Sequence, residues 1–361
     1  MHNVVRIFAA TAILLVAQEA FSRPFTDPRA ERSDAVEADP GFAAAPRDAA
    51  CSAAKLVSTG GPAPRNPYTL AVRWTGFSNF EIAYRDKIIL LDAFIDRGSN
   101  YPPLGFTASD VKHADLIILG HGHFDHMADA ASIAVRTGAL VVGAPVTTEK
   151  LVSQSVPAAQ IRTVTGKHGE ILQFDGFTVE PILARHAQPD PTLTAVMENA
   201  LNAVAPKPSP AQETEARAIR ARGTSDPRVI REGTIAYIIT LDNGFRIAYR
   251  DSGGHPTDHE RSAMARIGGV DLALVALSAE FLPSLTAQRA MEHMTLYKPD
   301  VFMPAHHDAA FSGHAPLWRA TEPVFQALKD ANPNIVTISR GYREPVCFNT
   351  EVNMMSQKGR H

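Results

Sequence analysis

The chain has 361 residues, which is enough for one large domain or two smaller ones. Hydrophobic residues make up 45% of it and charged residues 20%, an ordinary balance for a globular protein that buries a sizeable core. The formal net charge is -3, so the chain lacks the basic surplus typical of nucleic-acid-binding proteins. Composition therefore argues against a nucleic-acid partner.

The N-terminus has the pattern of an export signal. Arg6 supplies a positive charge, residues 7–17 are an uninterrupted apolar and small-residue run, and Ala20-Phe21-Ser22 has the small-x-small pattern of a cleavage site. The run is shorter than the roughly 20 apolar residues of a transmembrane helix, although an uncleaved anchor is the alternative. We predict a signal peptide at 1–22, a periplasmic or secreted protein, and no membrane span after signal removal.

The two cysteines, Cys51 and Cys347, lie near opposite ends of the mature chain. In an exported protein an even cysteine count suggests a disulfide. Such a bond would join the N-terminal arm to the last strand, and two unpaired thiols are the alternative.

Residues 23–67 are rich in Ala, Pro, Asp and Arg without sustained periodicity, which predicts a flexible arm. The folded domain is expected at 68–348, followed by a C-terminal tail at 349–361. The first half of the domain alternates or runs apolar in short segments, starting with an antiparallel meander. We expect strands at 68–74, 80–84, 87–91, 116–119 and 140–142, and helices at 128–137 and 147–153.

The second half opens with a predicted strand pair at 171–174 and 178–183. The turn Asp242-Asn243-Gly244 then indicates a hairpin of strands 234–241 and 245–249, because Asn-Gly adopts the positive φ angles that such turns need. Residues 189–232 predict a partly helical insertion, either close to the site or a surface excursion without function. Its helical patterning covers 192–204 and 211–222. Beyond the hairpin, we expect strands at 270–277, 301–303 and 335–338 and a helix at 286–296.

The two halves of the domain contain similar hairpins. Residues 80–92 and 236–251 both form a hairpin whose second strand ends in Asp. Two β-rich halves that each carry helices predict an α/β fold, a sandwich of two sheets covered by helices on both outer faces.

The segment Gly120-His121-Gly122-His123-Phe124-Asp125-His126 carries the most specific chemistry. It follows an apolar strand and precedes a helix. Imidazole and carboxylate groups are the ligands that divalent metals such as zinc prefer. His121 and His123 can point the same way from an extended turn, while Asp125 and His126 can face a second ion. The glycines permit a tight backbone path near the metals.

Three further donors follow predicted strands. His186 comes after 178–183, Asp251 ends the hairpin strand, and His306 comes after 301–303. Ligands at strand ends form a site at one edge of the sheets, where loops on a rigid scaffold carry function.

On these residues the chain resembles the metallo-β-lactamase superfamily, whose hallmark is the His-x-His-x-Asp-His run at 121–126. The resemblance implies a four-layer αββα sandwich. Segments 74–80, 88–92, 271–277 and 304–306 are similar to the branch of L-ascorbate-6-phosphate lactonase-like hydrolases and N-acyl-phosphatidylethanolamine-hydrolysing phospholipase D.

The resemblance also implies roles for the matching residues. The first metal would be held by His121, His123 and His186, and the second by Asp125, His126 and His306. Asp251 would bridge both metals, so Asp125 and Asp251 are the expected catalytic carboxylates. Asp92 matches a position that orients a ligand histidine.

The chain departs from this branch where substrate would bind. His307 and Asp308 follow the last ligand in place of a small or aromatic pair, and the insertion after His186 is unusual. We consider His255, His307 and Asp308 as candidates for substrate contact or for proton delivery to the leaving group.

The expected reaction is hydrolysis of an ester, lactone or phosphodiester bond by a hydroxide that bridges two divalent ions, zinc in the first place and manganese or iron as alternatives. The substrate would be a small molecule or lipid-like; the oligomeric state is not predicted. An exported β-lactamase is one alternative, disfavoured by Asp251. A mononuclear iron dioxygenase of the same fold and a non-catalytic binding module are the others.

Overall fold

The computed structural model describes residues 48–351, apart from 168, 189–190, 193, 197–198, 200–206, 278–282, 309, 312–314 and 317–320. The predicted signal peptide at 1–22, the first part of the arm and most of the tail lie outside the described residues. Within the described part, no helix has both the length and the apolar character needed to cross a membrane.

The first sheet has seven strands in the order β16-β1-β2-β3-β4-β5-β6. The first three strands form the predicted antiparallel meander, and β3, β4, β5 and β6 are parallel. The strands are β1 (Thr69–Trp74), β2 (Phe80–Tyr84), β3 (Lys87–Leu91), β4 (Leu116–Ile118), β5 (Leu140–Gly143), β6 (Ile161–Thr163) and β16 (Pro345–Asn349).

The second sheet repeats this plan in the order β15-β12-β11-β10-β9-β8-β7. It contains the antiparallel hairpin β9–β10, beside which β11 and β12 pair in parallel. In the first sheet, β4 and β5 pair in parallel beside the hairpin β2–β3 in the same way. The similarity of the two hairpins expected from the sequence is therefore real at the level of topology. The strands are β7 (Leu172–Phe174), β8 (Phe177–Leu183), β9 (Ile235–Leu241), β10 (Arg246–Arg250), β11 (Leu272–Ala276), β12 (Val301–Ala305) and β15 (Val336–Thr337).

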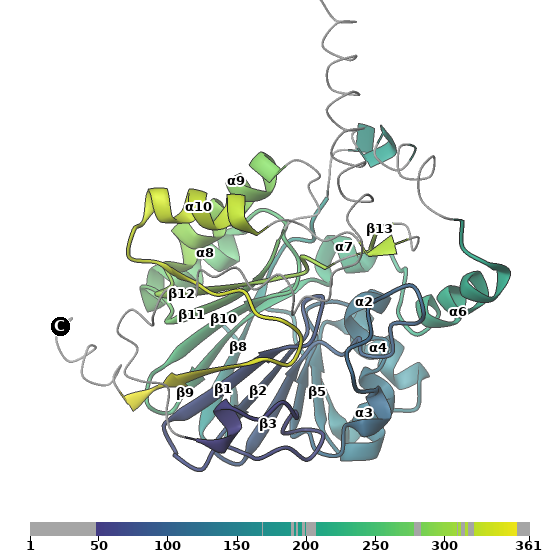
Figure 1. Ribbon diagram of the computed structural model, residues 1–361, viewed down its shortest axis with the longest axis horizontal. Coiled ribbons are helices and arrows are strands. Elements are labelled where there is room, and N and C mark those ends of the chain that lie inside the picture. Colours follow the sequence, from purple (N-terminus) through teal and green to yellow (C-terminus); the bar gives the residue numbers. More distant parts are fainter. Residues whose placement is uncertain are drawn as a thin grey trace, which may run out of the picture.

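Helices cover the outer face of each sheet, which confirms the αββα sandwich (Figure 1). On the first sheet lie α2 (Phe124–Met127), α3 (Ala130–Thr137) and α4 (Pro145–Ser153). On the second lie α8 (Asp258–Ile267), α9 (Pro283–Tyr297) and α10 (Glu322–Ala331). The insertion contributes α6 (Pro210–Arg220) and α7 (Arg228–Glu232), and short elements are η1 (Ala49–Cys51), η2 (Ala108–Asp110), η3 (Ala158–Gln160), β13 (Ala310–Phe311) and β14 (Ala315–Pro316).

The middle strands of each sheet are apolar on both faces because both of their faces are buried. In β11, Leu272 and Leu274 pack between the two sheets, whereas Ala273 and Val275 pack against the helices outside. Successive side chains of a strand point to opposite faces, so a continuous apolar run is what a middle strand of a four-layer fold requires.

The expectation of a flexible arm across 23–67 is wrong for its second part. From Asp48 onward the arm packs on the first sheet, where the backbone amides of Val57 and Ser58 donate to Glu81, at 2.9 and 2.8 Å. The cross-strand neighbour of Glu81, Arg73, donates to the Ala50 carbonyl at 2.6 Å. Both charged side chains are buried, and the arm's backbone supplies the partners that they need. Composition could not show this, because the partners are backbone groups.

The predicted disulfide is present between Cys51 in η1 and Cys347 in β16, with 5.7 Å between their Cα atoms. Strand β16 pairs with β1 at the edge of the first sheet, so the bond fastens the arm to that edge.

Candidate metal centre

The histidine-rich loop runs from the end of β4 into α2, and its glycines are required by space. A Cβ atom on Gly120 would lie 2.0 Å from Cγ of Asp251. A Cβ atom on Gly122 would lie 2.7 Å from a methyl group of Thr224. Because real Cβ atoms do not approach other atoms so closely, only glycine lets the loop pass beside these residues.

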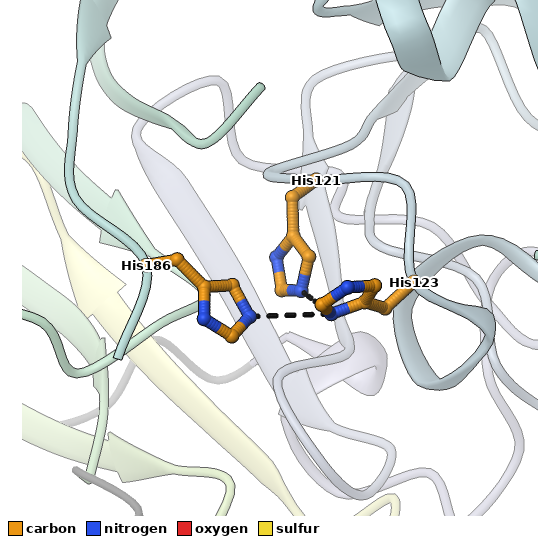
Figure 2. Close-up of side chains that lie close together, drawn as sticks. All are labelled: His121, His123 and His186. Atoms are coloured by element: carbon orange, nitrogen blue, oxygen red, sulfur yellow. Dashed lines mark hydrogen bonds between the residues drawn. The ribbon is translucent and has the colours of Figure 1, made fainter. Parts of the chain in front are cut away.

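Three histidines converge on one point, which we name the three-histidine cluster (Figure 2). Nε2 of His121 lies 3.0 Å from Nδ1 of His123, and Nε2 of His186 lies 3.2 Å from the same atom. His186 follows β8, so the loops of two sheets meet here. The three rings present nitrogen atoms to one another within the range that a shared cation requires.

A second group, the Asp125 cluster, consists of Asp125, His126 and His306. Oδ2 of Asp125 lies 3.5 Å from Nε2 of His126 and 3.4 Å from Nε2 of His306. His306 directly follows β12, while the other two belong to α2.

Asp251 lies between the two clusters and is fully buried. Its Oδ2 atom is 2.6 Å from Nδ1 of His121 and 3.3 Å from Nδ1 of His126. These contacts reach the ring nitrogens opposite those that face the clusters. Its Oδ1 atom has no hydrogen-bond partner within the described residues. A buried oxygen without a donor is costly unless something positive contacts it, which fits a cation.

Asp92 follows β3 and orients His126. Its Oδ2 atom lies 2.6 Å from Nδ1 of His126 and accepts from Ser78 Oγ at 2.6 Å. Its Oδ1 atom accepts from the backbone amide of Gly120 at 3.0 Å. The carboxylate therefore holds both the ring and the loop, so that Nε2 of His126 faces Asp125.

Electrostatics keep the three-histidine cluster neutral. Burial lowers the pKa of His121 well below its ordinary value, and the neighbouring imidazoles lower it further. Burial also lowers the pKa of His123, and it lowers the pKa of His186 to about 4, with His123 adding to the effect. Neutral imidazoles keep their lone pairs available for a metal at neutral pH.

The Asp125 cluster is charged. Burial would lower the pKa of His126, but Asp125, Asp92 and Asp251 raise it well above its ordinary value. Burial would likewise raise the pKa of Asp125, yet His126 holds it well below the usual range. Ionised carboxylates beside histidines are the donor set of a borderline divalent cation, so the residues fit the metal that the resemblance implies.

The structure does not bring His307, Asp308 or His255 to these clusters. The ring of His307 stacks on Trp74 with centroids 4.1 Å apart, so His306 and not His307 lies beside Asp125. His255 has a 55% exposed side chain and lies 2.9 Å from Glu292 on α9.

Asp308 as a candidate for substrate contact is wrong. Its carboxylate is fully buried and accepts from the amide of Phe77 at 2.7 Å, from Arg97 at 2.8 Å and from Tyr342 at 2.6 Å. A carboxylate engaged by three donors and closed off from solvent cannot meet a substrate.

An aromatic wall that the sequence does not predict lies beside the Asp125 cluster. The Phe77 ring lies 5.1 Å from that of His306 and 5.4 Å from that of Tyr101. Burial, with Asp125 nearby, raises the pKa of Tyr101. Tyr101 and Phe124 line a small cavity together with Ile219 and Arg220 of α6. No motif marks Tyr101, which lies in an irregular loop between β3 and β4.

The described part of the insertion lies on the ligand loop. The amide of Thr224 donates to the Gly122 carbonyl at 2.8 Å. Glu215 of α6 accepts from Ser99 at 2.6 Å, and Arg222 donates to the Asp96 carbonyl at 2.9 Å. Of the two interpretations of residues 189–232, these contacts favour an insertion that belongs to the site. The predicted helix at 211–222 corresponds to α6, while most of that at 192–204 falls outside the described residues.

Comparison with known proteins points to one superfamily. The profile of the Beta-lactamase superfamily domain matches residues 87–310. The UPF0173 metal-dependent hydrolase of Polynucleobacter asymbioticus is 24% identical over 271 residues, 74% of this chain and 83% of that protein. Another UPF0173 metal-dependent hydrolase, from Cupriavidus necator, is 28% identical over 62% of this chain and 68% of that protein. The structure titled Igni18, a novel metallo hydrolase from Ignicoccus hospitalis, has a TM-score of 0.53 at 16% identity, with 78% of this chain and 98% of that chain covered, which supports the fold alone.

Proposed function

The chain belongs to the metallo-β-lactamase superfamily, and from this premise we propose that it is a hydrolase that uses two divalent cations to cleave an ester, lactone or phosphodiester bond. One observation carries the proposal: six donor groups from both sheets form two adjacent clusters, and Asp251 contacts a histidine of each. The relatives named as metal-dependent hydrolases support it.

The three-histidine cluster would hold one cation and the Asp125 cluster the other. When bound, such cations lower the pKa of a coordinated water towards about 7 and polarise the oxygen of the bond to be cleaved. Zinc suits this mixture of imidazole and carboxylate, and manganese or iron are the alternatives.

The chain's own residues supply charge balance and orientation. Asp125 and Asp251 offset part of the positive charge, and what remains favours the negative oxygen of the transition state. Oδ1 of Asp251 has no hydrogen-bond donor among the described residues, so it would be available to a cation or could accept a proton from water. Asp92 keeps His126 aligned while the reaction proceeds.

The cavity beside the Asp125 cluster suggests how the substrate lies. Tyr101, Phe124 and Ile219 give it an apolar wall, and the charged side chains in its lining are two arginines, Arg97 and Arg220, and one carboxylate, Glu215. We propose that a small or lipid-like substrate places an apolar group against this wall, with any anionic group facing Arg220. The likeness of segments 74–80 and 88–92 to lactonase-like hydrolases and phospholipase D supports the same bond classes.

We also propose that the protein is exported. The bond between Cys51 and Cys347 supports this, because disulfides persist mainly in oxidising compartments. Mass spectrometry of the protein from its native host should find a mature chain that starts near Arg23. An intact Met1 on the mature protein would contradict the signal peptide.

A metal-controlled hydrolysis screen tests the reaction. Chelator-treated protein would be assayed on carboxylic esters, lactones, phosphodiesters and the β-lactam nitrocefin, before and after addition of Zn²⁺, Mn²⁺ or Fe²⁺. We expect turnover of one of the first three classes only with metal, loss of turnover in His123→Ala, and retention in His307→Ala. Preferred cleavage of nitrocefin, or one iron per chain with oxygen consumption, would contradict the proposal in favour of the β-lactamase or the dioxygenase.

A further inference from the structure

Two groups of the same composition lie behind the two clusters, each made of an arginine, a carboxylate and a tyrosine. We name them the β10 triad, which contains Arg250, Glu260 and Tyr297, and the β12 triad, which contains Arg97, Asp308 and Tyr342. In both triads one carboxylate oxygen receives the arginine and the tyrosine hydroxyl together.

In the β10 triad, Oε1 of Glu260 accepts from Nε of Arg250 at 2.9 Å and from the hydroxyl of Tyr297 at 2.6 Å. All three residues are fully buried. The remaining nitrogens of Arg250 donate to backbone carbonyls of Arg185, at 3.1 Å, and of Ser252. Arg185 precedes His186 and Ser252 follows Asp251 in the chain, so Arg250 fixes the loops that carry these two donors.

Close contacts make this fixation tight. A Cβ atom on Gly254 would lie 2.2 Å from the carbonyl oxygen of Arg185 and 2.6 Å from that of His186. The hydroxyl of Ser252 accepts from the amide of Ala187 at 2.9 Å. The loop after β8 therefore rests directly on the loop after β10, with the Arg250 guanidinium joining them.

In the β12 triad, Oδ2 of Asp308 accepts from Arg97 at 2.8 Å and from Tyr342 at 2.6 Å. Its Oδ1 atom accepts from the amide of Phe77 at 2.7 Å, and the carbonyl of Phe77 accepts from the amide of His306 at 2.7 Å. His306 has a φ of 59°, in the left-handed region that a non-glycine residue adopts only when its surroundings hold it there. The triad and Phe77 provide that support.

Stability alone does not explain these groups. Burying an arginine–carboxylate pair costs desolvation energy that a well-packed apolar group of similar volume avoids, so such pairs are weak evidence for stabilisation. Both pairs are almost completely buried. Arg250 directly precedes Asp251 in the chain, and Asp308 follows His306 by two residues. Metal ligands in proteins are commonly oriented by such supporting groups.

We propose that the triads are two separate positioning units: the β10 triad holds His186 for the three-histidine cluster, and the β12 triad holds His306 for the Asp125 cluster. This inference rests on the proposed metal centre but not on its hydrolytic activity. Loss of one triad should weaken the cation on its own side most. Because Asp251 contacts a histidine of each cluster, loss of the β10 triad should also weaken the second cation, but to a smaller extent.

The test uses Tyr297→Phe and Tyr342→Phe, each of which removes one hydroxyl and keeps the ring. Each change is made in two single-site backgrounds, His186→Ala, which retains the Asp125 cluster, and His306→Ala, which retains the three-histidine cluster. Zn²⁺ affinity is measured by competition with a chromophoric chelator. We expect Tyr297→Phe to weaken Zn²⁺ binding by about 10- to 100-fold in His306→Ala and by much less in His186→Ala. Tyr342→Phe should show the reverse pattern, with the larger loss in His186→Ala.

The matched control is Tyr84→Phe. The Tyr84 hydroxyl also donates to a carboxylate, that of Asp242, at 2.9 Å. Asp242 lies in the turn between β9 and β10, at the end of β10 opposite Asp251. It should leave Zn²⁺ affinity unchanged in both backgrounds, and thermal unfolding of the metal-free variants reports folding. Equal weakening in both backgrounds, or no weakening beyond that of Tyr84→Phe, would overturn the inference. Normal metal binding without hydrolysis of any substrate would instead refute the proposed function. The triads would still be tested by whether each tyrosine variant loses Zn²⁺ affinity mainly in its own background.

Discussion

Removal of the disulfide is the perturbation whose size the structure defines best. Cys51 and Cys347 are 296 residues apart, so the bond closes a loop that contains nearly the whole folded domain. The double variant Cys51→Ser, Cys347→Ser opens this loop and changes two sulfur atoms to oxygens.

The chain-entropy model gives roughly 5–6 kcal/mol for a loop of this length, and measured effects of disulfides are commonly smaller. The arm also has contacts that do not depend on the bond. Asp48 accepts from the amides of Ala50, Arg65 and Asn66, at 3.0, 2.7 and 3.1 Å, and Glu81 holds the segment that follows Cys51. The arm should therefore stay in place, and we expect a loss of about 3–5 kcal/mol in the free energy of unfolding.

Urea unfolding under oxidising conditions measures this loss. Reduction of the wild type should reproduce the midpoint of the double variant, and reductant should not shift the double variant itself. A difference in the free energy of unfolding below about 1 kcal/mol would refute the reasoning, because it would mean that the closed loop scarcely restricts the unfolded chain.

The site predicts two further effects of substitution, and the buried His293 of α9 predicts a third. Asp251→Ala should lower metal content and turnover far more than His307→Ala, because His307 packs on Trp74. Elemental analysis and initial rates measure the two effects. Full metal occupancy in Asp251→Ala would contradict a role for Asp251 in metal binding. Ile219→Ala should raise KM for apolar substrates by about 10-fold, a loss of roughly 1–2 kcal/mol in binding, and Arg220→Ala should do the same for anionic substrates. Unchanged KM values would exclude the cavity as the substrate site. Burial, and then the charge of Arg250, lowers the pKa of His293 well below its ordinary value. The folded state therefore favours the neutral imidazole, and this contribution to the free energy of unfolding is complete above the unfolded pKa of about 6.5. It is lost as pH falls below that value, by up to about 1.4 kcal/mol per pH unit. His293→Gln should flatten the dependence of unfolding free energy on pH between about 5 and 6.5, and an unchanged slope would contradict it.

Much of the fold could be predicted because its signals are local. The strands between two helical layers must be apolar on both faces, and the Asp242-Asn243-Gly244 turn marks its hairpin without reference to the rest of the chain. The apolar pattern does not predict helix α8, because only a narrow stripe of this helix is buried, although Thr257 and Glu260 form a capping box at its start.

The site divides in the same way. His121 to His126 are adjacent in the chain, so their spacing alone predicts shared chemistry. Tyr101 and α6 meet only in the folded structure, and no pattern in either segment points to the other. The substrate contact expected for Asp308 is wrong, because proximity to His306 in the chain does not bring its side chain to the clusters. In the structure the Asp308 carboxylate instead meets Phe77, Arg97 and Tyr342.

The number of cations bound per chain, determined together with turnover, tests whether the protein holds two metal ions for hydrolysis. Wild-type protein would be stripped with a chelator and titrated with Zn²⁺, while hydrolysis of the best substrate from the screen is followed at each addition. We expect two equivalents bound in the wild type and one equivalent in His186→Ala and in His306→Ala. Turnover should rise only as both clusters fill. Full turnover in the stripped protein, or zinc binding that survives loss of both His186 and His306, would contradict these expectations.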